Sequence, residues 1–397
     1  MSAIHIAPPE LIASPHGGDP AVSAAIDFAG TPLRLWIRLP GAAPECRTES
    51  FIAPLLLPAM AQRLPIECAG AVSPLYLRQL ETIQDIFATW LPSLRRVPVR
   101  APVGPAASAD SGSLPGPEAA AFFTGGVDSF HTVLSHADEI RRLVFVPHFE
   151  APPGSPELGA EIEARLRAAA AELGMELLVA ETNLRSAEVL RVLEPGRYSP
   201  KLWNFELAHG AALAAIAHAL PRAVGRVYVA ASATYDDLFP WGSHPLLDPL
   251  WSTETRQIVH DGCAHTRVAK AARIASSGVA LRALRVCAVQ HRAEYNCGRC
   301  EKCLRTMVEL EIVGALPRAK TFPNRLNLLH VALLPNDERS RDYLEENLRA
   351  AQATGRHAAL ARALRIALRP RGLPRRALGL GLKARRVARS ILPLLGS

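Results

Sequence analysis

The sequence is poor in the features that mark secreted and membrane proteins. Its seven cysteines in 397 residues are too few for a disulfide scaffold, and four of them fall between positions 287 and 303. No uninterrupted apolar run is long enough to span a bilayer. The segment 1–5 has neither the basic start nor the apolar stretch of a secretory signal. We therefore expect a cytoplasmic protein.

Acidic residues are absent from the end of the chain, and this changes how the net charge is interpreted. The whole sequence carries +8, with 45 Lys or Arg against 37 Asp or Glu, but residues 349–397 hold twelve basic residues and no acidic one. The remainder has 33 basic and 37 acidic residues, a net charge of −4. Because the basic character belongs to this tail, it does not indicate a nucleic-acid-binding protein as a whole.

Residues 1–100 are expected to form a small appended α+β domain. Its predicted elements, judged from period-2 and period-3.6 patterns of apolar residues, are strands at 26–28 and 33–39 and helices at 51–63 and 75–91. Residues 101–118 are rich in Ala, Pro, Gly and Ser, a composition typical of a linker.

From residue 119 to residue 320, apolar strands alternate with periodic helices. The predicted strands are 119–124, 143–149, 177–182 and 227–231, and the predicted helices are 129–135, 158–173 and 205–220. This order is typical of an open parallel sheet with helices on both faces, so we expect a doubly wound α/β domain. Residues 321–397 are expected to form a basic C-terminal extension, mostly helical from residue 337 onward.

A glycine-rich loop, Phe-Thr-Gly-Gly-Val-Asp-Ser at 123–129, joins the first strand and helix of this domain. The glycines let a ligand approach the main chain, and the N–H groups at the helix start attract an anion. Two hydroxyls add donors, and Asp128 can hold a Mg²⁺ ion that bridges phosphates. The loop therefore predicts ATP binding by Thr124, Gly125, Gly126, Val127, Asp128 and Ser129.

Four cysteines, Cys287, Cys297, Cys300 and Cys303, follow with the spacing C-x9-C-x2-C-x2-C. Four thiolates suit tetrahedral Zn²⁺, which prefers soft sulfur ligands. An iron–sulfur cluster is the alternative, although the cysteine–proline pair that ends a ferredoxin run is absent. Because four protein ligands leave no open position, we expect a structural rather than a catalytic zinc site.

The loop resembles the SGGxDS signature of the PP-loop ATP pyrophosphatases, with Thr124 in place of the first serine. Together with the cysteine cluster and the following Leu304-Arg305, it resembles the 7-cyano-7-deazaguanine synthase (QueC) family over residues 119–316. The resemblance implies an adenine nucleotide alpha hydrolase-like fold and cleavage of ATP between its α and β phosphates. It also implies adenylation of a carboxylate, whose AMP is then displaced by ammonia to give an amide or nitrile.

Two further residues resemble family positions. Asn204 looks like the asparagine of an Arg-Asn pair that contacts the nucleotide, although Trp203 replaces the arginine. Lys270 looks like the lysine that precedes a helix and faces the departing pyrophosphate, where a compact positive charge stabilises the transition state. A solvated surface lysine is the alternative. The resemblance thus implies Asp128, Ser129 and Lys270 as catalytic residues.

The segment after the fourth predicted strand, residues 235–245, should line the pocket for a small-molecule substrate, because ligands of such sheets bind beyond the carboxyl ends of strands. The predicted substrate residues are Trp241, Ser243, His244 and Asp248. His244 could equally be a structural histidine, and tryptophans are more often core residues. The family carries a Tyr-Pro-Asp-Cys type sequence here that this chain lacks, so its substrate is not expected to be the deazapurine.

Three other interpretations stay open. Sulfur transfer to RNA, which other PP-loop proteins perform, would need a persulfide on Cys263, the best placed of the remaining cysteines. A non-enzymatic binding protein is less compatible with an intact Asp128 and Ser129. The helix carrying Arg362 and Arg365 can contact nucleic acid or anionic lipid, or form a solvated face. A homodimer is compatible with all of these.

Overall fold

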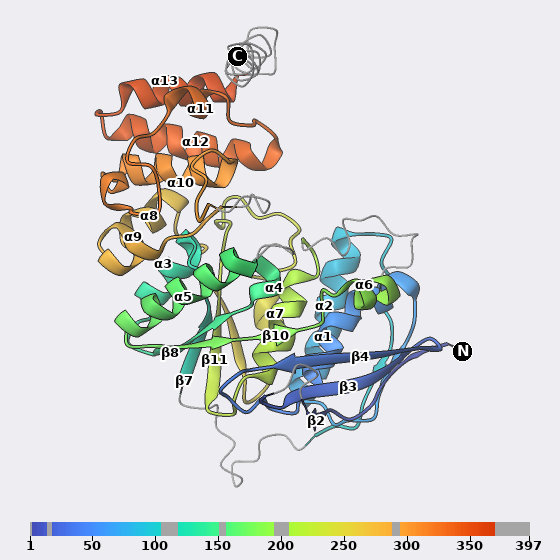
Figure 1. The fold of residues 1–397 in the computed structure, drawn as a ribbon. Helices are drawn as coiled ribbons and strands as arrows, with labels where there is room; N and C mark the ends of the chain where they lie inside the picture. Colours follow the sequence, from blue (N-terminus) through green and yellow to red (C-terminus); the bar gives the residue numbers. More distant parts are fainter. Residues whose placement is uncertain are drawn as a thin grey trace, which may run out of the picture. The chain divides into compact units, whose positions relative to one another are not determined.

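The computed structural model describes residues 2–13, 18–104, 118–150, 156–193, 206–287 and 294–369. The chain divides into two compact units, Met1–His265 and Thr266–Ser397, and each is described by itself (Figure 1). Among the described residues, no helix combines the length and the apolar character needed to cross a membrane.

The first unit contains a five-stranded sheet with the order β12-β11-β7-β8-β9, in which every neighbouring pair is parallel. Its strands are β7 (Glu118–Phe122), β8 (Ile140–Phe145), β9 (Glu176–Val179), β11 (Val224–Ala230) and β12 (Gln257–Asp261). The first of these five strands in chain order, β7, is central: β8 and β9 lie on one side of it, and β11 and β12 lie on the other. The expectation of a parallel α/β sheet is confirmed.

Both faces of this sheet are buried. In β7, Ala120 and Phe122 belong to a hydrophobic core shared with α7, while Ala119 and Ala121, which point to the opposite face, are buried as well. Strands buried on both faces are apolar throughout rather than alternating, which is why these segments could be recognised in the sequence. The helices of the unit are α1 (Glu49–Gln62), α2 (Pro74–Trp90), α3 (Val127–Ser135), α4 (Pro147–Glu150), α5 (Pro156–Glu172), α6 (Ala187–Leu193), α7 (His209–Ala219) and the 3₁₀ helix η2 (Asp248–Trp251).

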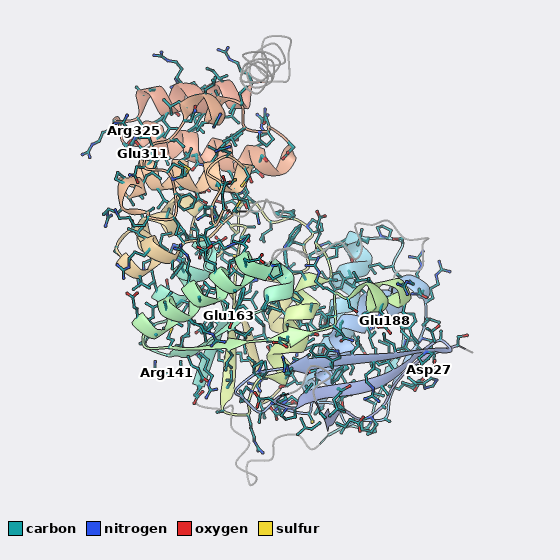
Figure 2. All side chains as sticks on the ribbon, in the orientation of Figure 1. Asp27, Arg141, Glu163, Glu188, Glu311 and Arg325 are labelled. Atoms are coloured by element: carbon teal, nitrogen blue, oxygen red, sulfur yellow. The ribbon has the colours of Figure 1, made fainter. Side chains whose placement is uncertain are left out.

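A second, mixed sheet is built mainly from the N-terminal residues, with the order β10-β4-β3-β1-β5-β6 and β2 paired with β3. Its strands are β1 (Ile4–Ile6), β2 (Glu10–Ile12), β3 (Ala21–Phe28), β4 (Thr31–Arg38), β5 (Ile66–Cys68), β6 (Val99–Arg100) and β10 (Glu181–Thr182). The edge strand β10 comes from the middle of the chain, directly after β9, and pairs antiparallel with β4. Exposed charged side chains such as Asp27 of β3 lie on this part of the chain (Figure 2).

The N-terminal residues share one hydrophobic core with the parallel sheet. This core includes residues on both sides of the domain boundary expected at residues 101–118. Helix α1 is buried from Ser50 to Ala61, and it packs against α7. A helix that is apolar all round needs neighbours on more than one side, and α1 finds them in the N-terminal sheet and in α7. The independence of residues 1–100 as a domain stays a prediction, and the shared core argues against it.

The second unit is helical over its described residues. Its elements are α8 (Arg267–Ala275), α9 (Gly278–Ala283), α10 (Glu301–Ile312), the 3₁₀ helix η3 (Leu316–Arg318), α11 (Leu328–Ala332), α12 (Glu338–Ala353) and α13 (Ala358–Leu368). The helical character expected beyond residue 337 is confirmed for α12 and α13. Since α10 shares a core with both of them, the compact unit begins well before the expected boundary at residue 320.

The apolar face of α13 is used inside this helical core. Leu360 and Leu364 are buried in a core shared with α10, α11 and α12, while Arg362, Arg365 and Arg369 are exposed. This arrangement agrees with a solvated basic face, and it leaves no free apolar stripe on α13 for a lipid surface. The rest of the basic tail, residues 370–397, lies outside the described residues.

Several elements differ from their predicted limits. The strand expected to reach Phe149 ends at Phe145 and is followed by α4, and the helix expected from Phe205 begins at His209. Strand β12 was not predicted, because its sequence Gln-Ile-Val-His-Asp contains three polar residues among five. As an edge strand it keeps only part of its surface in the core, so an apolar run is not required.

Candidate functional site

The glycine-rich loop forms the turn between the central strand β7 and helix α3. Gly125 has a φ of +73°, a left-handed conformation that L side chains rarely adopt. Gly126 is the N-cap of α3 and offers no side chain to cap the first turn of the helix. The backbone N–H groups of that turn are therefore directed toward the loop, as in sites that bind phosphate groups.

The polar residues of the loop are held close to this turn. Ser129 is buried and its hydroxyl donates to the carbonyl oxygen of Gly126 at 3.2 Å. Thr124 and Asp128 are half-buried on either side of the glycines. The structure thus brings residues 124–129 together in the predicted strand–turn–helix, while nucleotide binding itself stays a prediction.

The other two residues implied by the family resemblance are placed differently. Asn204 lies outside the described residues. Lys270 lies on α8 of the second unit, within the helix rather than before it, and its side chain is only 1% exposed. The alternative of a solvated surface lysine is therefore wrong, and the role of Lys270 toward a nucleotide stays a prediction.

Helix α3 is tied to the carboxyl end of β12. Asp261, the last residue of that strand, accepts hydrogen bonds from Thr132 Oγ1 at 2.7 Å and from His136 Nε2 at 3.0 Å. Burial raises the pKa of Asp261, but these two hydrogen bonds outweigh it and hold the pKa below its usual value. The loop after β7 and the turn after β12 consequently belong to the same edge of the sheet.

Three of the four predicted substrate residues form one buried cluster. Asp248 accepts a hydrogen bond from Ser243 Oγ at 2.6 Å, and the backbone N–H of His244 points to the same carboxylate at 3.4 Å. The cluster gains a member that sequence analysis missed: His260 Nδ1 lies 2.7 Å from Asp248 Oδ2. The string His-Asp-Gly-Cys at 260–263 places this histidine close to Cys263, which was the only signal in the sequence.

The loop that carries this cluster packs closely on the start of α7. Gly242 donates its N–H to the carbonyl oxygen of Glu206 at 2.6 Å, and a Cβ added to it would lie 2.3 Å from the carbonyl oxygen of Leu207. Residues 235–240, by contrast, are exposed. The loop therefore combines a fixed base with an exposed tip at the edge where a substrate is expected.

The aromatic residues near this loop have unequal roles. Trp251 is 1% exposed and packs against Tyr76 with ring centroids 6.1 Å apart, so it is a core residue. Trp241 is half-buried beside Phe239 at 5.6 Å. His244 receives a hydrogen bond at Nδ1 from the N–H of Leu246 at 3.1 Å, which favours its structural interpretation.

Within this cluster, His260 is the histidine whose pKa is raised. Burial alone would lower its pKa, but contacts with the Asp248 carboxylate and the Cys263 thiol raise the pKa to about 9. Burial and the nearby charge of His260 lower the pKa of His244. The two histidines therefore differ in charge at neutral pH, with His260 protonated and His244 neutral.

The second unit contains the four cysteines as one compact cluster, in which all four Sγ atoms lie within 4.8 Å of one another. The Sγ atoms of Cys287 and Cys300, and those of Cys297 and Cys303, are each 4.0 Å apart. Four sulfurs at a Zn–S distance of about 2.3 Å would be separated by about 3.8 Å, so the geometry fits a tetrahedral ion. The cluster could hold a metal ion such as Zn²⁺.

Local hydrogen bonds explain why the thiols converge. The backbone N–H groups of Cys300 and Cys303 point at Cys297 Sγ and Cys300 Sγ at 3.3 and 3.4 Å. Gly298, between Cys297 and Cys300, has a φ of +64°, as a tight turn between ligands requires. Asn296 Oδ1 accepts from the N–H of Cys287 at 3.2 Å and thereby holds the distant cysteine against the turn.

The positively charged Arg305, which follows the cysteines, pairs with other groups. The guanidinium of Arg305 lies 3.9 Å over the ring of Tyr343 and 3.5 Å from Glu301. Arg305 therefore stabilises the packing of α10 on α12, a role that does not depend on a metal.

Comparison with protein-family models, with curated proteins and with solved structures finds no match to this chain. Function is therefore inferred from the chemistry of the two clusters and of the glycine-rich loop. The loop and the Ser243–Asp248–His260 cluster belong to the first unit, and the four cysteines belong to the second.

Replacing Gly125 by Ala should weaken ATP binding and cost about 1–2 kcal/mol of stability, because an L side chain is strained at this φ. Gly174→Ala is the matched control, since Gly174 has a φ of +70° and open space around a new Cβ. Urea unfolding and calorimetric titration with ATP measure the two effects. Equal ATP affinity in both variants would contradict a phosphate-binding role for the loop.

The His260–Asp248 pair should make stability depend on pH. Because the pKa of His260 rises from 6.5 to about 9 on folding, its contribution is fully present below pH 6.5 and is lost as pH rises through about 9. Asp248→Asn removes the charge partner, so the stability gap between wild type and variant should shrink over this window. Chemical denaturation between pH 6 and 10, with Asp236→Asn on the exposed loop as control, tests this; a constant gap would refute it.

Replacing Cys303 by Ser should abolish metal binding and lower the thermal stability of the second unit, because this thiol is fully buried in the cluster. Cys46→Ser, at an exposed cysteine of the first unit, should retain the metal. Elemental analysis of purified protein gives both content and identity. Zinc is expected, whereas bound iron with the visible absorption of an iron–sulfur cluster would refute zinc.

Proposed function

We propose that this chain is an ATP-dependent, AMP-forming ligase that adenylates a carboxylate and couples it to a nitrogen nucleophile. The observation that carries the proposal is the turn at residues 124–129, where a left-handed glycine leads from the central parallel strand into the uncapped start of α3. A phosphate group is the ligand that such a turn favours most.

The strand order supports a doubly wound, adenine nucleotide alpha hydrolase-like sheet. Succeeding strands move away from β7 in one direction and then in the other, so the order reverses between β7 and β11. In open sheets of this kind the ligand crevice lies outside the carboxyl ends of the strands at the reversal. The glycine-rich loop follows one of these two strands, and the proposed substrate loop follows the other.

Each residue of the loop has a proposed task. The backbone N–H groups and the hydroxyls of Thr124 and Ser129 bind the phosphates, and Asp128 holds the Mg²⁺ that accompanies ATP. The carboxylate of the substrate attacks the α phosphorus, and pyrophosphate leaves. The family resemblance adds Asn204 as a nucleotide contact.

The substrate is proposed to bind between the exposed tip and the buried base of the loop after β11. Exposed aromatic side chains at the tip, Tyr235 and Phe239, suit a planar molecule, and the buried Ser243–Asp248–His260 cluster offers fixed hydrogen-bonding groups. Trp241 lies between these two parts of the loop. Ammonia or an amine then displaces AMP to give an amide, and dehydration of a primary amide gives a nitrile.

The zinc proposed for the four cysteines has a structural role. Four thiolates close its coordination shell and leave no position for a substrate. In this it differs from the Mg²⁺ proposed at Asp128, which keeps water and phosphate ligands.

Sulfur transfer to RNA is the second candidate, because Cys263 lies at the same edge of the sheet as the glycine-rich loop. The backbone carbonyl of Cys263 accepts a hydrogen bond from Tyr235 of the proposed substrate loop at 3.0 Å. A persulfide on this thiol would attack an adenylated base, with AMP as the leaving group in both reactions.

Incubation with α- and γ-labelled ATP, ammonia and a panel of carboxylates tests the proposal. The panel includes the carboxylate that corresponds to 7-cyano-7-deazaguanine. AMP and pyrophosphate are the expected products, and Asp128→Asn should lower their formation by at least about a hundredfold, since it removes the magnesium ligand. Asp138→Asn, in the exposed turn between α3 and β8, is the control. Release of ADP and phosphate alone would sink the proposal.

A further inference from the structure

The charges of the chain divide unequally between its two compact units. The second unit, Thr266–Ser397, contains 26 Lys or Arg and nine Asp or Glu, a net charge of +17, whereas the first unit has 19 basic and 28 acidic residues, a net charge of −9. Residues 266–348 alone contain 14 basic and nine acidic residues. The basic character therefore extends beyond the tail to which the sequence pattern assigned it, and it is typical of a unit that binds polyanions.

Three segments of the second unit pack on one another beside the cysteine cluster. Lys320, which follows η3, donates its N–H to the carbonyl oxygen of Leu281 in α9 at 3.1 Å. Pro323 lies against the cysteine turn (residues 295–303), because a Cβ added to Gly298 would be 2.9 Å from Pro323 Cγ. Helix α9, the cysteine turn and the segment that follows η3 are therefore neighbours.

Five exposed cations, here called the basic surface, lie on the cysteine turn, on η3 and on the segment that follows η3. They are Arg299, Lys302, Arg318, Lys320 and Arg325. Within the part of the chain that the structure describes, none of the five has an ion-pair partner. Because no carboxylate neutralises them, their charges are available to an anion from outside the chain.

The acidic residues of the same stretch do not offset the basic surface. Glu309 is fully buried and lies 3.1 Å from Arg267, and the half-buried Glu301 lies 3.5 Å from Arg305. Neither of these arginines belongs to the basic surface. The two other acidic residues between 278 and 325 are the half-buried Glu311 and the exposed Glu294.

Exposed arginines of the first unit are arranged differently. Six of them lie no more than 3.5 Å from a carboxylate oxygen: Arg34, Arg96, Arg100, Arg165, Arg167 and Arg226. Pairs of this kind are weak, but they neutralise the charge that a partner would otherwise meet. The unpaired basic surface is therefore a distinct feature of the second unit.

The second unit offers few groups that could recognise bases. Its only Phe, Trp or Tyr residues are Tyr295 and Phe322, which are buried, and Tyr343, whose ring is covered by the guanidinium of Arg305 at 3.9 Å. Proteins that bind single strands stack bases on exposed aromatic side chains. The basic surface therefore suits the phosphate groups of a duplex, which carry the charge without exposing the faces of the bases.

A membrane surface fits the second unit less well. Helices that lie on anionic lipid insert a continuous apolar stripe, and the stripe of α13 is buried in the helical core. Leu328 and Leu329 are exposed on α11, but this helix has only five residues.

We propose that the second unit binds the phosphate groups of a nucleic-acid duplex through the basic surface. The interaction goes beyond the proposed ligase activity and does not depend on it, because it requires neither ATP nor the glycine-rich loop. Each cation that meets a phosphate releases a counterion, so the affinity falls steeply as salt concentration rises. Contacts to phosphate carry no sequence information, so unrelated duplexes bind alike.

The test uses full-length protein without ATP and fluorescein-labelled duplexes of about 20 base pairs, in DNA and in RNA form, in an anisotropy titration. Two unrelated DNA sequences should bind with dissociation constants within about threefold of each other. The logarithm of the dissociation constant should rise with the logarithm of salt concentration with a slope of about 4–5, as neutralisation of about five phosphates requires.

Two pairs of substitutions test the basic surface. Arg318→Gln with Lys320→Gln, outside the cysteine turn, should weaken binding at least about tenfold at low salt and lower the slope by about 2. Arg299→Gln with Lys302→Gln should do the same, and elemental analysis checks that this variant keeps the metal content of wild type. The matched control is Arg63→Gln with Arg222→Gln, which removes the same charge from two exposed arginines of the first unit and should change neither quantity.

Unchanged affinity and slope in both pairs would overturn the proposal, because the remaining basic residues would then account for the binding. An equal loss in the control pair would do so too, since net charge rather than the basic surface would be responsible. Tighter binding to vesicles of phosphatidylcholine and phosphatidylserine, lost in the same variants, would replace the duplex by a membrane. Because ATP is absent throughout, failure of AMP formation in the ligase assay leaves these outcomes unaffected.

Discussion

The first unit depends on the burial of β7 at the centre of a parallel sheet. Every neighbouring pair of strands in this sheet is parallel, so all strands run in the same direction. Their carboxyl ends therefore meet at one edge of the sheet. The glycine-rich loop therefore lies at the same edge as the loop after β11 and the turn after β12, although β11 and β12 come much later in the chain. A left-handed Gly125 is the local condition that lets the chain leave the buried strand and enter α3 at once.

Local features of the fold could be predicted, and features that depend on distant contacts could not. The strands β7, β8, β9 and β11 are apolar runs because both faces of the sheet are covered, so the sequence identifies them without knowledge of the topology. The edge strand β12 carries polar residues and reads as a loop. Likewise, the low-complexity segment at 101–118 suggested a separate N-terminal domain, whereas α1 is buried by partners on both sides of that segment.

The same distinction applies to the candidate site. The glycine-rich loop and the cysteine cluster are short motifs, and residue spacing alone predicts that their members lie together. Cys287 is the exception, because Asn296 holds it in place. The Ser243–Asp248–His260 cluster is assembled from a loop and an edge strand, and no spacing rule links its members. Burying the Asp248 carboxylate costs free energy unless its hydrogen bonds with Ser243 and His260 are made. The cluster therefore constrains the conformation of the loop, in addition to the close backbone contact of Gly242.

The metal cluster has a consequence for the end of the chain. Cys300 is the N-cap of α10, and Cys303 lies in its first turn, so an ion held by these thiols fixes where that helix begins. The apolar face of α10 that follows, with Leu304, Val308 and Ile312, forms the core on which α13 packs. The exposed arginines of α13 thus owe their position to a core that starts at the cysteines. A charge pattern that resembles a membrane-binding helix in the sequence is here the outer surface of a helical unit that begins at a four-cysteine cluster.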